Sequence, residues 1–156
     1  MNLDLLNKMH QYGFRKFGDF RTSEDQKVNY FPLTGCEDKV DKPKVYIWIT
    51  LIKNETDVLY IGKTQFDIKK RMTQHRQGFK GNLNNGSISG SRKYKAMIDI
   101  FNANGKIEVW AKVAGVNEFQ INGIKTVPRS FYSVEEEYFI HHFRNILNFQ
   151  LPHNAK

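Results

Sequence analysis

The chain has 156 residues, of which 40% are hydrophobic, and this is enough for one domain with a single core. The longest apolar run, near residues 45–52, is far shorter than the roughly 20 residues of a membrane-spanning helix, and the first residues lack the apolar core of a signal peptide. We therefore expect a soluble, cytoplasmic protein without a membrane partner. The single cysteine, Cys36, excludes an internal disulfide and a cysteine-built zinc site.

Residues 1–43 are expected to form an N-terminal extension packed on the core, and residues 44–156 the main domain. The extension carries as many acidic as basic side chains, and phenylalanines recur at Phe14, Phe17 and Phe20. This many aromatic residues argues against disorder. The pattern leaves open whether the extension lengthens a sheet or covers one of its faces.

Residues 44–64 predict an antiparallel hairpin. Residues 44–52 are β-branched and aromatic, residues 54–57 form a turn cluster, and residues 58–62 are apolar again. Both alternating sets of the first strand are apolar, so we expect that strand to be covered on both faces. A helix is predicted from Thr64, and the i, i+4 spacing puts Arg71 and His75 on one of its faces.

The rest of the chain predicts two helices and one strand. A loop rich in Gly, Asn and Ser (78–91) leads to a helix capped by Ser91, and a strand follows at 106–114. Residues 115–130 are loop-rich with room for a short hairpin, and Ser133 opens a last helix that runs to about Asn148. The predicted class is α/β (α+β), with a mostly antiparallel three-stranded sheet flanked by helices. Four residues of the middle helix are predicted to face the core: Tyr94, Met97, Ile98 and Phe101. Four of the strand are expected on its buried side: Ile107, Val109, Ala111 and Val113.

The positive charge is concentrated in one segment. Residues 63–95 hold nine Lys or Arg side chains against one acid, Asp67, and so account for the whole formal net charge of +8. A basic stripe beside a neutral remainder is typical of a protein that binds a polyanion. A solvated helix face that only keeps the protein in solution is the alternative.

Glu136 falls in the middle of an apolar stripe on the last helix. A carboxylate on an apolar face is costly unless it is paired or binds a metal ion. The alternative is a capping box, because Ser133-x-x-Glu136 has the spacing in which the glutamate bonds the serine amide. The helix by itself does not decide between a metal ligand and a cap.

Tyr60-Ile61-Gly62, followed by Arg71 and His75, resembles the GIY-YIG nuclease family, whose members cleave DNA with a divalent metal ion. The first half of the family motif is Lys44-Val45-Tyr46 here, so a lysine replaces the glycine and the tyrosine is kept. The resemblance spans roughly residues 44–154 and is strongest to compact stand-alone phage and restriction-type endonucleases. It implies a metal-dependent DNA endonuclease, and it favours the metal-ligand interpretation of Glu136.

The resemblance also implies roles for single residues. Tyr46 would be the general base, helped by Lys63 or His75, and Tyr60 would orient the water or the phosphate. Arg71 would bind a non-bridging phosphate oxygen, and Glu136 would hold one Mg²⁺ or Mn²⁺ ion. The predicted catalytic residues are Tyr46, Tyr60, Lys63, Arg71, His75 and Glu136. Strand packing for either tyrosine, and a core role for His75, are the structural alternatives.

The predicted partner is double-stranded DNA. Ser91 to Lys95 combines a hydroxyl, three cations and an aromatic ring, which suits phosphate contact and stacking. The family asparagine is assigned to Asn154, with Asn148 as a rival. The predicted DNA-binding residues are Lys69, Lys70, Arg76, Lys80, Ser91, Arg92, Lys93, Tyr94, Lys95 and Asn154. Contact with DNA is a third role for residues 1–43. A catalytically silent DNA-binding module and an RNA-binding protein are the alternative functions, and the sequence does not decide between a monomer and a homo-oligomer.

Overall fold

A five-stranded antiparallel sheet forms the centre of the computed structural model, which describes residues 3–35, 42–79, 88–117, 120–125 and 129–154. Across the sheet the strands follow the order β2-β1-β5-β3-β4, so β2 and β4 are its edges. The strands are β1 (Arg15–Thr22), β2 (Val28–Pro32), β3 (Lys44–Ile52), β4 (Glu55–Thr64) and β5 (Lys106–Val113).

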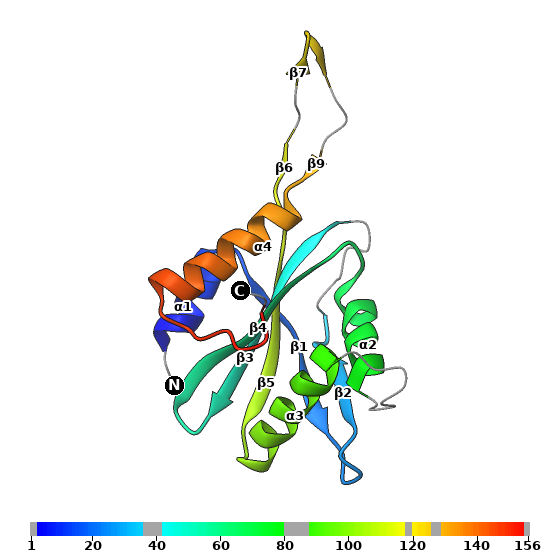
Figure 1. The fold of residues 1–156 in the computed structure, drawn as a ribbon, viewed down its shortest axis with the longest axis vertical. Coiled ribbons are helices and arrows are strands. Elements are labelled where there is room, and N and C mark those ends of the chain that lie inside the picture. The colour runs from blue at the N-terminus through cyan, green and yellow to red at the C-terminus, as the bar shows by residue number, and fades with distance from the viewer. Residues whose placement is uncertain (1–2, 36–41, 80–87, 118–119, 126–128, 155–156) are drawn as a thin grey trace.

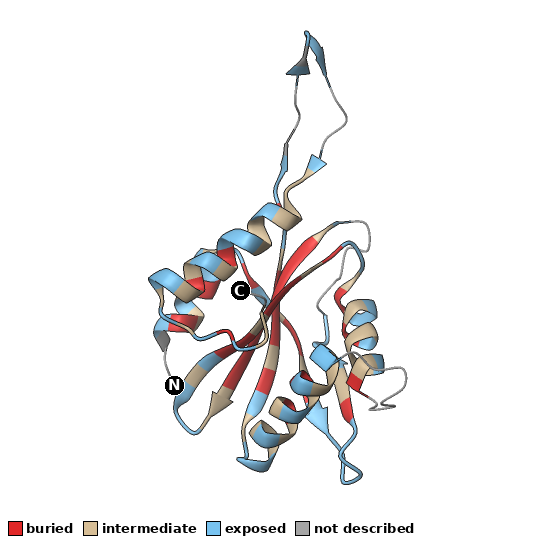
Figure 2. Ribbon diagram, viewed as in Figure 1, coloured by how far each residue is buried: buried red, intermediate tan, exposed pale blue. Residues whose placement is uncertain are grey.

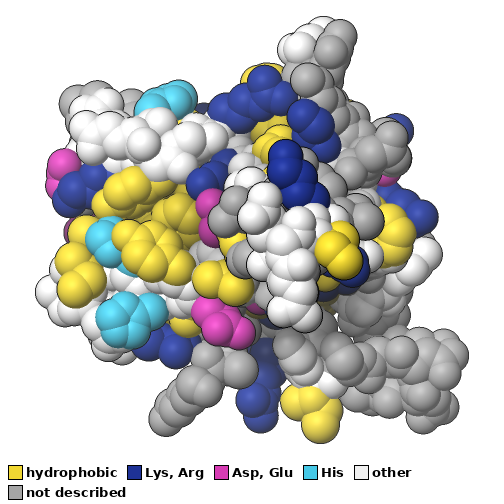
Figure 3. Space-filling model, turned by 90° about the horizontal axis from the view of Figure 1, so that it is seen from above, with side chains coloured by type: hydrophobic (Ala, Val, Ile, Leu, Met, Phe, Trp, Pro, Cys, Tyr) yellow, Lys and Arg dark blue, Asp and Glu magenta, His cyan; other side chains and the backbone are white. Residues whose placement is uncertain are grey.

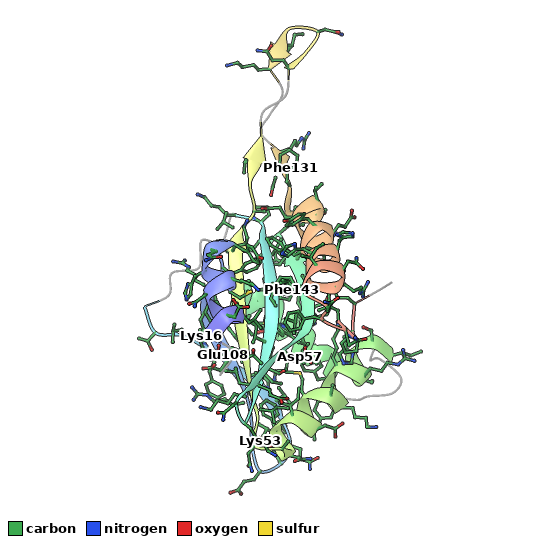
Figure 4. All side chains as sticks on the ribbon, turned by 90° about the vertical axis from the view of Figure 1, so that its left-hand side faces the viewer. Lys16, Lys53, Asp57, Glu108, Phe131 and Phe143 are labelled. Atoms are coloured by element: carbon green, nitrogen blue, oxygen red, sulfur yellow. The ribbon has the colours of Figure 1, made fainter. Side chains whose placement is uncertain are left out.

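Helices cover both faces of the sheet (Figure 1). On one face lie α1 (Leu3–Gln11) and α4 (Tyr132–His141), and on the other α2 (Ile68–Phe79) and α3 (Ile88–Asn102). The last turn of α4 widens into a π-helix (His142–Ile146), from which Phe143 packs against the sheet (Figure 4). Buried residues line both faces of the central strands, so the molecule has two cores with the sheet between them (Figure 2). The predicted α+β class and the antiparallel sheet are confirmed.

The sheet has five strands rather than the predicted three because residues 15–32 add two. A bulge in β1 between Lys16 and Gly18 shifts its register against β5. The bulge allows Phe17 and Phe20 to be buried in the same cluster although they are three positions apart, a spacing that puts side chains of a regular strand on opposite faces. Because of the extra residue in the bulge, the buried residues of β1 do not alternate regularly along the sequence. The extension both lengthens the sheet through β1 and β2 and covers a face of it through α1.

The predicted hairpin is present as β3 and β4, joined by a tight turn in which Lys53 has a φ of 56°. β3 lies between β5 and β4, and its residues 44–50 are buried, as the apolar pattern predicts. The predicted helix start at Thr64 is wrong by four residues. β4 continues to Thr64, and Asp67 caps α2 by accepting a hydrogen bond from the Lys70 amide at 2.7 Å.

β5 departs from the predicted alternation of buried and exposed residues. Trp110 lies on the side of the strand that the pattern predicts to be exposed, but only 5% of it is exposed. Val113, which the pattern predicts to be buried, is 41% exposed. β5 lies between β1 and β3, so helices cover both of its faces and the strand is buried on both sides along its middle. Ile107, Val109 and Ala111 are buried as predicted. On α3, Met97 is fully buried, and Tyr94, Ile98 and Phe101 pack against the same core.

A β-ribbon arm leaves the sheet at the start of α4 (Figure 1). Phe131 stands at its base, where its amide donates to the Gly115 carbonyl (Figure 4). The predicted short hairpin lies within the arm, and its turn has Asn122 at φ 51° and Gly123 at φ 75°, the left-handed region that a two-residue hairpin needs. The arm consists of β6 (Val116–Asn117) paired with β9 (Arg129–Ser130), and β7 (Gln120–Ile121) paired with β8 (Ile124–Lys125). Within the described residues, no helix has the length and apolar character needed to cross a membrane.

Candidate active site

Tyr46 and His75 form the buried part of the candidate site. Tyr46 lies on β3 and is 0% exposed, and its hydroxyl oxygen is 2.5 Å from His75 Nε2 on α2. Arg71, one turn earlier on α2, donates from Nε to the same oxygen at 3.2 Å. The predicted shared face of Arg71 and His75 is therefore confirmed, because both residues reach one tyrosine. Burial lowers the pKa of His75 to about 3, with Arg71 and Lys93 adding to the effect, so the imidazole is neutral.

Gly62 makes the position of this tyrosine possible. It is paired with Tyr46 across the β3–β4 hairpin. A Cβ atom at Gly62 would collide with the Tyr46 hydroxyl and would lie 2.8 Å from Tyr60 Cε1. A side chain at position 62 would thus displace the tyrosines, which gives the glycine of Tyr60-Ile61-Gly62 a steric reason. At the other end of the motif, Lys44 is 1% exposed and its ammonium donates to the Lys42 carbonyl at 2.9 Å.

An open cavity of about 280 Å³ lies at the end of β4, next to the buried tyrosine. Tyr60 and Lys63 come from β4, Arg71 from α2, and Tyr132 and Glu136 from the first turns of α4. The remaining lining residues are Thr64, Gln65 and Phe66. Four of the six predicted catalytic residues thus line one cavity. The other two, Tyr46 and His75, lie behind that wall and contact Tyr60 with their rings.

Glu136 points into this cavity rather than capping its own helix. α4 begins at Tyr132, and its cap residue Phe131 makes no side-chain hydrogen bond, so the capping box at Ser133 is wrong. The Glu136 carboxylate instead lies 3.0 Å from the Lys63 ammonium, with 16% of its side chain exposed. Its neighbour Glu135 faces another way and bonds Lys112 and the Gly115 amide, each at 2.8 Å.

One carboxylate in an open cavity fits a Mg²⁺ or Mn²⁺ ion, which keeps several waters and needs only one or two protein oxygens. The Lys63 ammonium already places a positive charge against Glu136 Oε2. Within the described residues, no group of three or more His, Cys, Asp or Glu side chains gathers to form a closed metal site. The donor set therefore suits an ion shared between Glu136, water and a bound phosphate, and not a cage made by the protein alone.

The two tyrosines differ in their access to the cavity. Burial raises the pKa of Tyr46 well above the usual value for a tyrosine, and burial also raises that of Tyr60. The two hydroxyl groups interact with each other, and Arg71 favours the ionised form of both. Tyr60 borders the cavity, whereas Tyr46 reaches it only past Tyr60 and Arg71.

The predicted DNA-binding residues are divided between the surface and the interior. Lys69, Lys70, Arg92 and Lys95 are exposed, Ser91 and Arg76 are half-buried, and Lys80 lies outside the described residues. Tyr94 is half-buried and donates its hydroxyl to the Gln26 carbonyl at 2.8 Å, so it ties α3 to the β1–β2 turn. Lys93 is 7% exposed and faces inward. From the end of the molecule where the arm projects, Lys and Arg side chains lie beside hydrophobic ones (Figure 3). Separately, the Lys70 ammonium lies 4.2 Å from the Phe66 ring centroid.

Asn154 closes the edge of the sheet. Its side-chain oxygen accepts from the Ile61 amide at 3.0 Å, and its side-chain nitrogen donates to the Ile61 carbonyl at 2.6 Å. These bonds satisfy the outer backbone groups of the edge strand β4 directly after Tyr60. Asn148 is exposed with a φ of 60° at the end of the π-helix. Of the two asparagines, Asn154 is therefore the one in contact with the Tyr60-Ile61-Gly62 segment.

Three residues at the site were not predicted from the sequence. Tyr132 lines the cavity and accepts a hydrogen bond from Gln65 Nε2 at 2.6 Å, and Gln74 accepts one from Arg71 Nη1 at 3.0 Å. The Gln74 contact fixes the guanidinium and is an i, i+3 pair on α2, a spacing that the sequence does contain. The sequence around Tyr132 contains no signal for a site residue, because the residues before it belong to the arm.

Comparison with known proteins agrees with this geometry. Residues 42–111 match the model of the GIY-YIG catalytic domain. Over this segment the chain is similar to the GIY-YIG family. The match covers the β3–β4 hairpin, α2, α3 and most of β5, and ends before the helix that carries Glu136. No curated protein matches the sequence.

Two solved structures share the fold well beyond the matched segment. A mutant of bacteriophage T4 EndoII superposes with a TM-score of 0.63 at 17% identity, covering 89% of this chain and 94% of its own. The restriction endonuclease HPY188I in complex with product DNA gives a TM-score of 0.50 at 17% identity, covering 96% of this chain and 84% of its own. The predicted resemblance to the GIY-YIG family and its compact phage and restriction-type members is thereby confirmed.

Proposed function

We propose that the chain is a metal-dependent DNA endonuclease that hydrolyses phosphodiester bonds in double-stranded DNA. The observation that carries the proposal is the convergence of Tyr60, Arg71 and Glu136 on one open cavity. These residues come from β4, α2 and α4, and Glu136 lies outside the segment that matches the family model. HPY188I, which has a similar fold, is a restriction endonuclease in complex with product DNA, and this supports DNA as the substrate here.

In the proposed reaction, Arg71 contacts the phosphate and Glu136 contacts the metal ion. The Arg71 guanidinium, held by Tyr46 and Gln74, binds a non-bridging oxygen of the phosphate and stabilises the charge that develops there. Glu136 would hold a single Mg²⁺ or Mn²⁺ ion, which would supply positive charge for the oxygen that leaves. Lys63 and the ion would compete for the Glu136 carboxylate, so a bound ion would leave the Lys63 ammonium available to the phosphate.

Tyr46 and His75 are proposed to work as one base. Tyr46 accepts a proton from the attacking water while it gives its own proton to His75 Nε2, which lies 2.5 Å away. The imidazole is neutral, but a pKa of about 3 makes it a weak base, so this transfer requires the negative charge of a bound phosphate nearby to raise that pKa. Tyr60, which borders the cavity and interacts with the Tyr46 hydroxyl, orients the water. Lys63 has no contact with Tyr46 in this scheme and assists only at the phosphate.

A cleavage assay on supercoiled plasmid tests the proposal directly. We expect the wild-type protein to relax or linearise the plasmid with Mg²⁺ or Mn²⁺ and to be inactive in EDTA, and Arg71→Ala to be inactive with either metal. Both proteins should still bind a DNA duplex. If the wild type binds the duplex but cleaves with neither metal, the chain is the silent DNA-binding module instead. Binding of RNA in preference to DNA would favour the third alternative.

A further inference from the structure

Lys93 is a buried lysine, and no acidic partner for it is found among the described residues. It lies on α3 and is 7% exposed, although it belongs to the basic segment that the sequence assigns to the surface. Its ammonium sits over the face of the Tyr60 ring, 3.8 Å from the ring centroid. Among the residues that the structure describes, no carboxylate lies within ion-pairing distance of it. Its exposed neighbours on the same helix, Arg92 and Lys95, do not share this environment.

The groups that face Lys93 make its position more unfavourable for a cation. Arg71 and His75 face it from α2, Tyr60 from β4, and His153 from the C-terminal segment. Arg92 precedes it on α3 and adds a further positive charge near His153. Burial lowers the pKa of Lys93 to about 8, and the charge of Arg71 contributes. The Lys93 charge in turn lowers the pKa values of His75 and His153.

A buried cation beside another cation is a cost to folding unless an anion joins them. Arg71, which is half-buried, has no described carboxylate in direct contact either, because its described partners are the Tyr46 hydroxyl and the Gln74 side-chain oxygen. The charge of Glu136 reaches Arg71, but its carboxylate is already paired with Lys63. Among the residues that the structure describes, the site thus holds two cations without a carboxylate in direct contact.

We propose that Lys93 binds a backbone phosphate of the DNA next to the one held by Arg71, on the opposite side of the Tyr60 ring. Lys93 does not line the cavity that contains Glu136, while Tyr60 does, so the ring stands between Lys93 and that cavity. One phosphate in the cavity and its neighbour at Lys93 would set the register of the strand against the catalytic residues. This inference rests on the proposed DNA endonuclease function.

If Lys93 binds a phosphate, the DNA affinity should depend on pH in a way that an arginine or a surface lysine would not produce. In the free protein the ammonium loses its proton near pH 8, and a bound phosphate favours the charged form and raises the pKa again. DNA binding above pH 8 therefore requires uptake of one proton. The affinity falls by up to about tenfold per pH unit between pH 8 and the pKa of the bound state.

The test compares Lys93→Met, Lys93→Arg and the exposed control Lys95→Met, all combined with Glu136→Gln so that the DNA stays intact. Affinity for a short DNA duplex is measured by fluorescence anisotropy from pH 7 to 9.5. At pH 7 we expect Lys93→Met to lose about tenfold or more and Lys95→Met only a few fold. The affinity of the Lys93 protein should fall above pH 8, and that of Lys93→Arg should not. Equal losses in the two methionine variants, or the same pH dependence in Lys93→Arg, would overturn the proposal.

Two further measurements separate a binding role from a structural one. Lys93→Met removes a buried, unpaired charge, so its melting temperature at pH 7 should exceed that of the wild type. A lower melting temperature with unchanged DNA affinity would assign Lys93 to folding and refute the inference. If the wild type binds no DNA, the proposed function fails. Nuclear magnetic resonance titration of the lysine side chains with inorganic phosphate then decides the anion site by itself: a pKa of Lys93 that rises with phosphate supports it, and one that does not move rejects it.

Discussion

The Lys63 ammonium lies 3.0 Å from Oε2 of Glu136, so a lysine from the end of β4 occupies the carboxylate that is proposed to hold the metal ion. This contact joins the β3–β4 hairpin to α4, although 67 residues separate the end of β4 from the start of α4 along the chain. It also places a cation where the reaction needs one. Because a carboxylate oxygen cannot bind both partners fully, occupation by an ion and occupation by Lys63 are coupled.

Replacing Glu136 by Gln should abolish cleavage while DNA binding persists. Glutamine keeps the size of the side chain but removes the charge that holds the ion and pairs with Lys63. We expect no Mg²⁺-dependent cutting of supercoiled plasmid and a duplex affinity within a few fold of the wild type. Glu137→Gln is the matched control, since Glu137 is exposed. Glu135 is unsuitable because it bonds Lys112 and the Gly115 amide. Full cutting by Glu136→Gln would remove the residue from the site.

Replacing Lys63 by Met should separate metal binding from catalysis. Without the competing ammonium, Glu136 is free to bind Mn²⁺ more tightly, and isothermal titration should show a higher affinity for the ion. Cleavage should nevertheless fall, because a positive charge near the phosphate is lost. The control is Lys70→Met, an exposed lysine of α2. Unchanged Mn²⁺ affinity in Lys63→Met would show that the ion pair does not compete with the metal.

The sequence predicts the catalytic end of the molecule better than the other half. The hairpin, Arg71 and His75 were predictable because the i, i+4 spacing and the strand composition are local signals. The sequence leaves open whether residues 1–43 lengthen the sheet, and it does not reveal β1 because the bulge after Lys16 breaks the alternation on which a strand prediction depends.

Other errors came from tertiary contacts. Trp110 and Lys93 are buried although their sequence neighbourhoods are polar, since the first is covered by a helix on its far face and the second by Tyr60. The capping box at Ser133 was plausible because its spacing was right, but α4 starts one residue earlier and Lys63 takes the carboxylate. The burial of Trp110 and Lys93 and the pairing of Glu136 depend on contacts between distant segments, which the local pattern of a single sequence does not reveal.

The exposed cations of α3 should contribute to the salt dependence of DNA binding. Arg92 and Lys95 are exposed and lie on the same helix as the buried Lys93. Each phosphate contact contributes roughly 0.9 to the slope of log affinity against log salt, so the double substitution of Arg92 and Lys95 by Gln should flatten the slope by up to about two. Anisotropy titrations at several salt concentrations measure it. The comparison is Lys27→Gln, on the β1–β2 turn. A slope that the double variant leaves unchanged would place α3 outside the DNA interface.

His75 should make the fold sensitive to acid. Its pKa is lowered to about 3 in the folded protein from about 6.5, mainly by burial, so the folded state binds fewer protons than the unfolded state between these two values. The free energy of unfolding should then fall by about 1.4 kcal/mol per pH unit as the pH drops from 6.5 toward 3, on account of this residue. His75→Gln lacks the titration and keeps an acceptor for Tyr46. Denaturant unfolding at several pH values should show the stability of the wild type decreasing relative to His75→Gln. The exposed His141→Gln should follow the wild type, and parallel curves for all three would contradict the burial of His75.

The identity of the base is testable through the two tyrosines. Tyr46→Phe removes the hydroxyl that His75 and Arg71 both contact, so the turnover number should fall by a factor of about 100 or more while duplex affinity changes little. Tyr60→Phe should be milder if that hydroxyl only orients the water. Single-turnover cleavage and anisotropy on the same duplex separate chemistry from binding. If Tyr60→Phe is the more damaging variant, the base is the tyrosine that borders the cavity, and Tyr46 is its positioning partner. If both phenylalanine variants cleave like the wild type, the proton leaves by a route that includes neither tyrosine, and the proposed base is wrong.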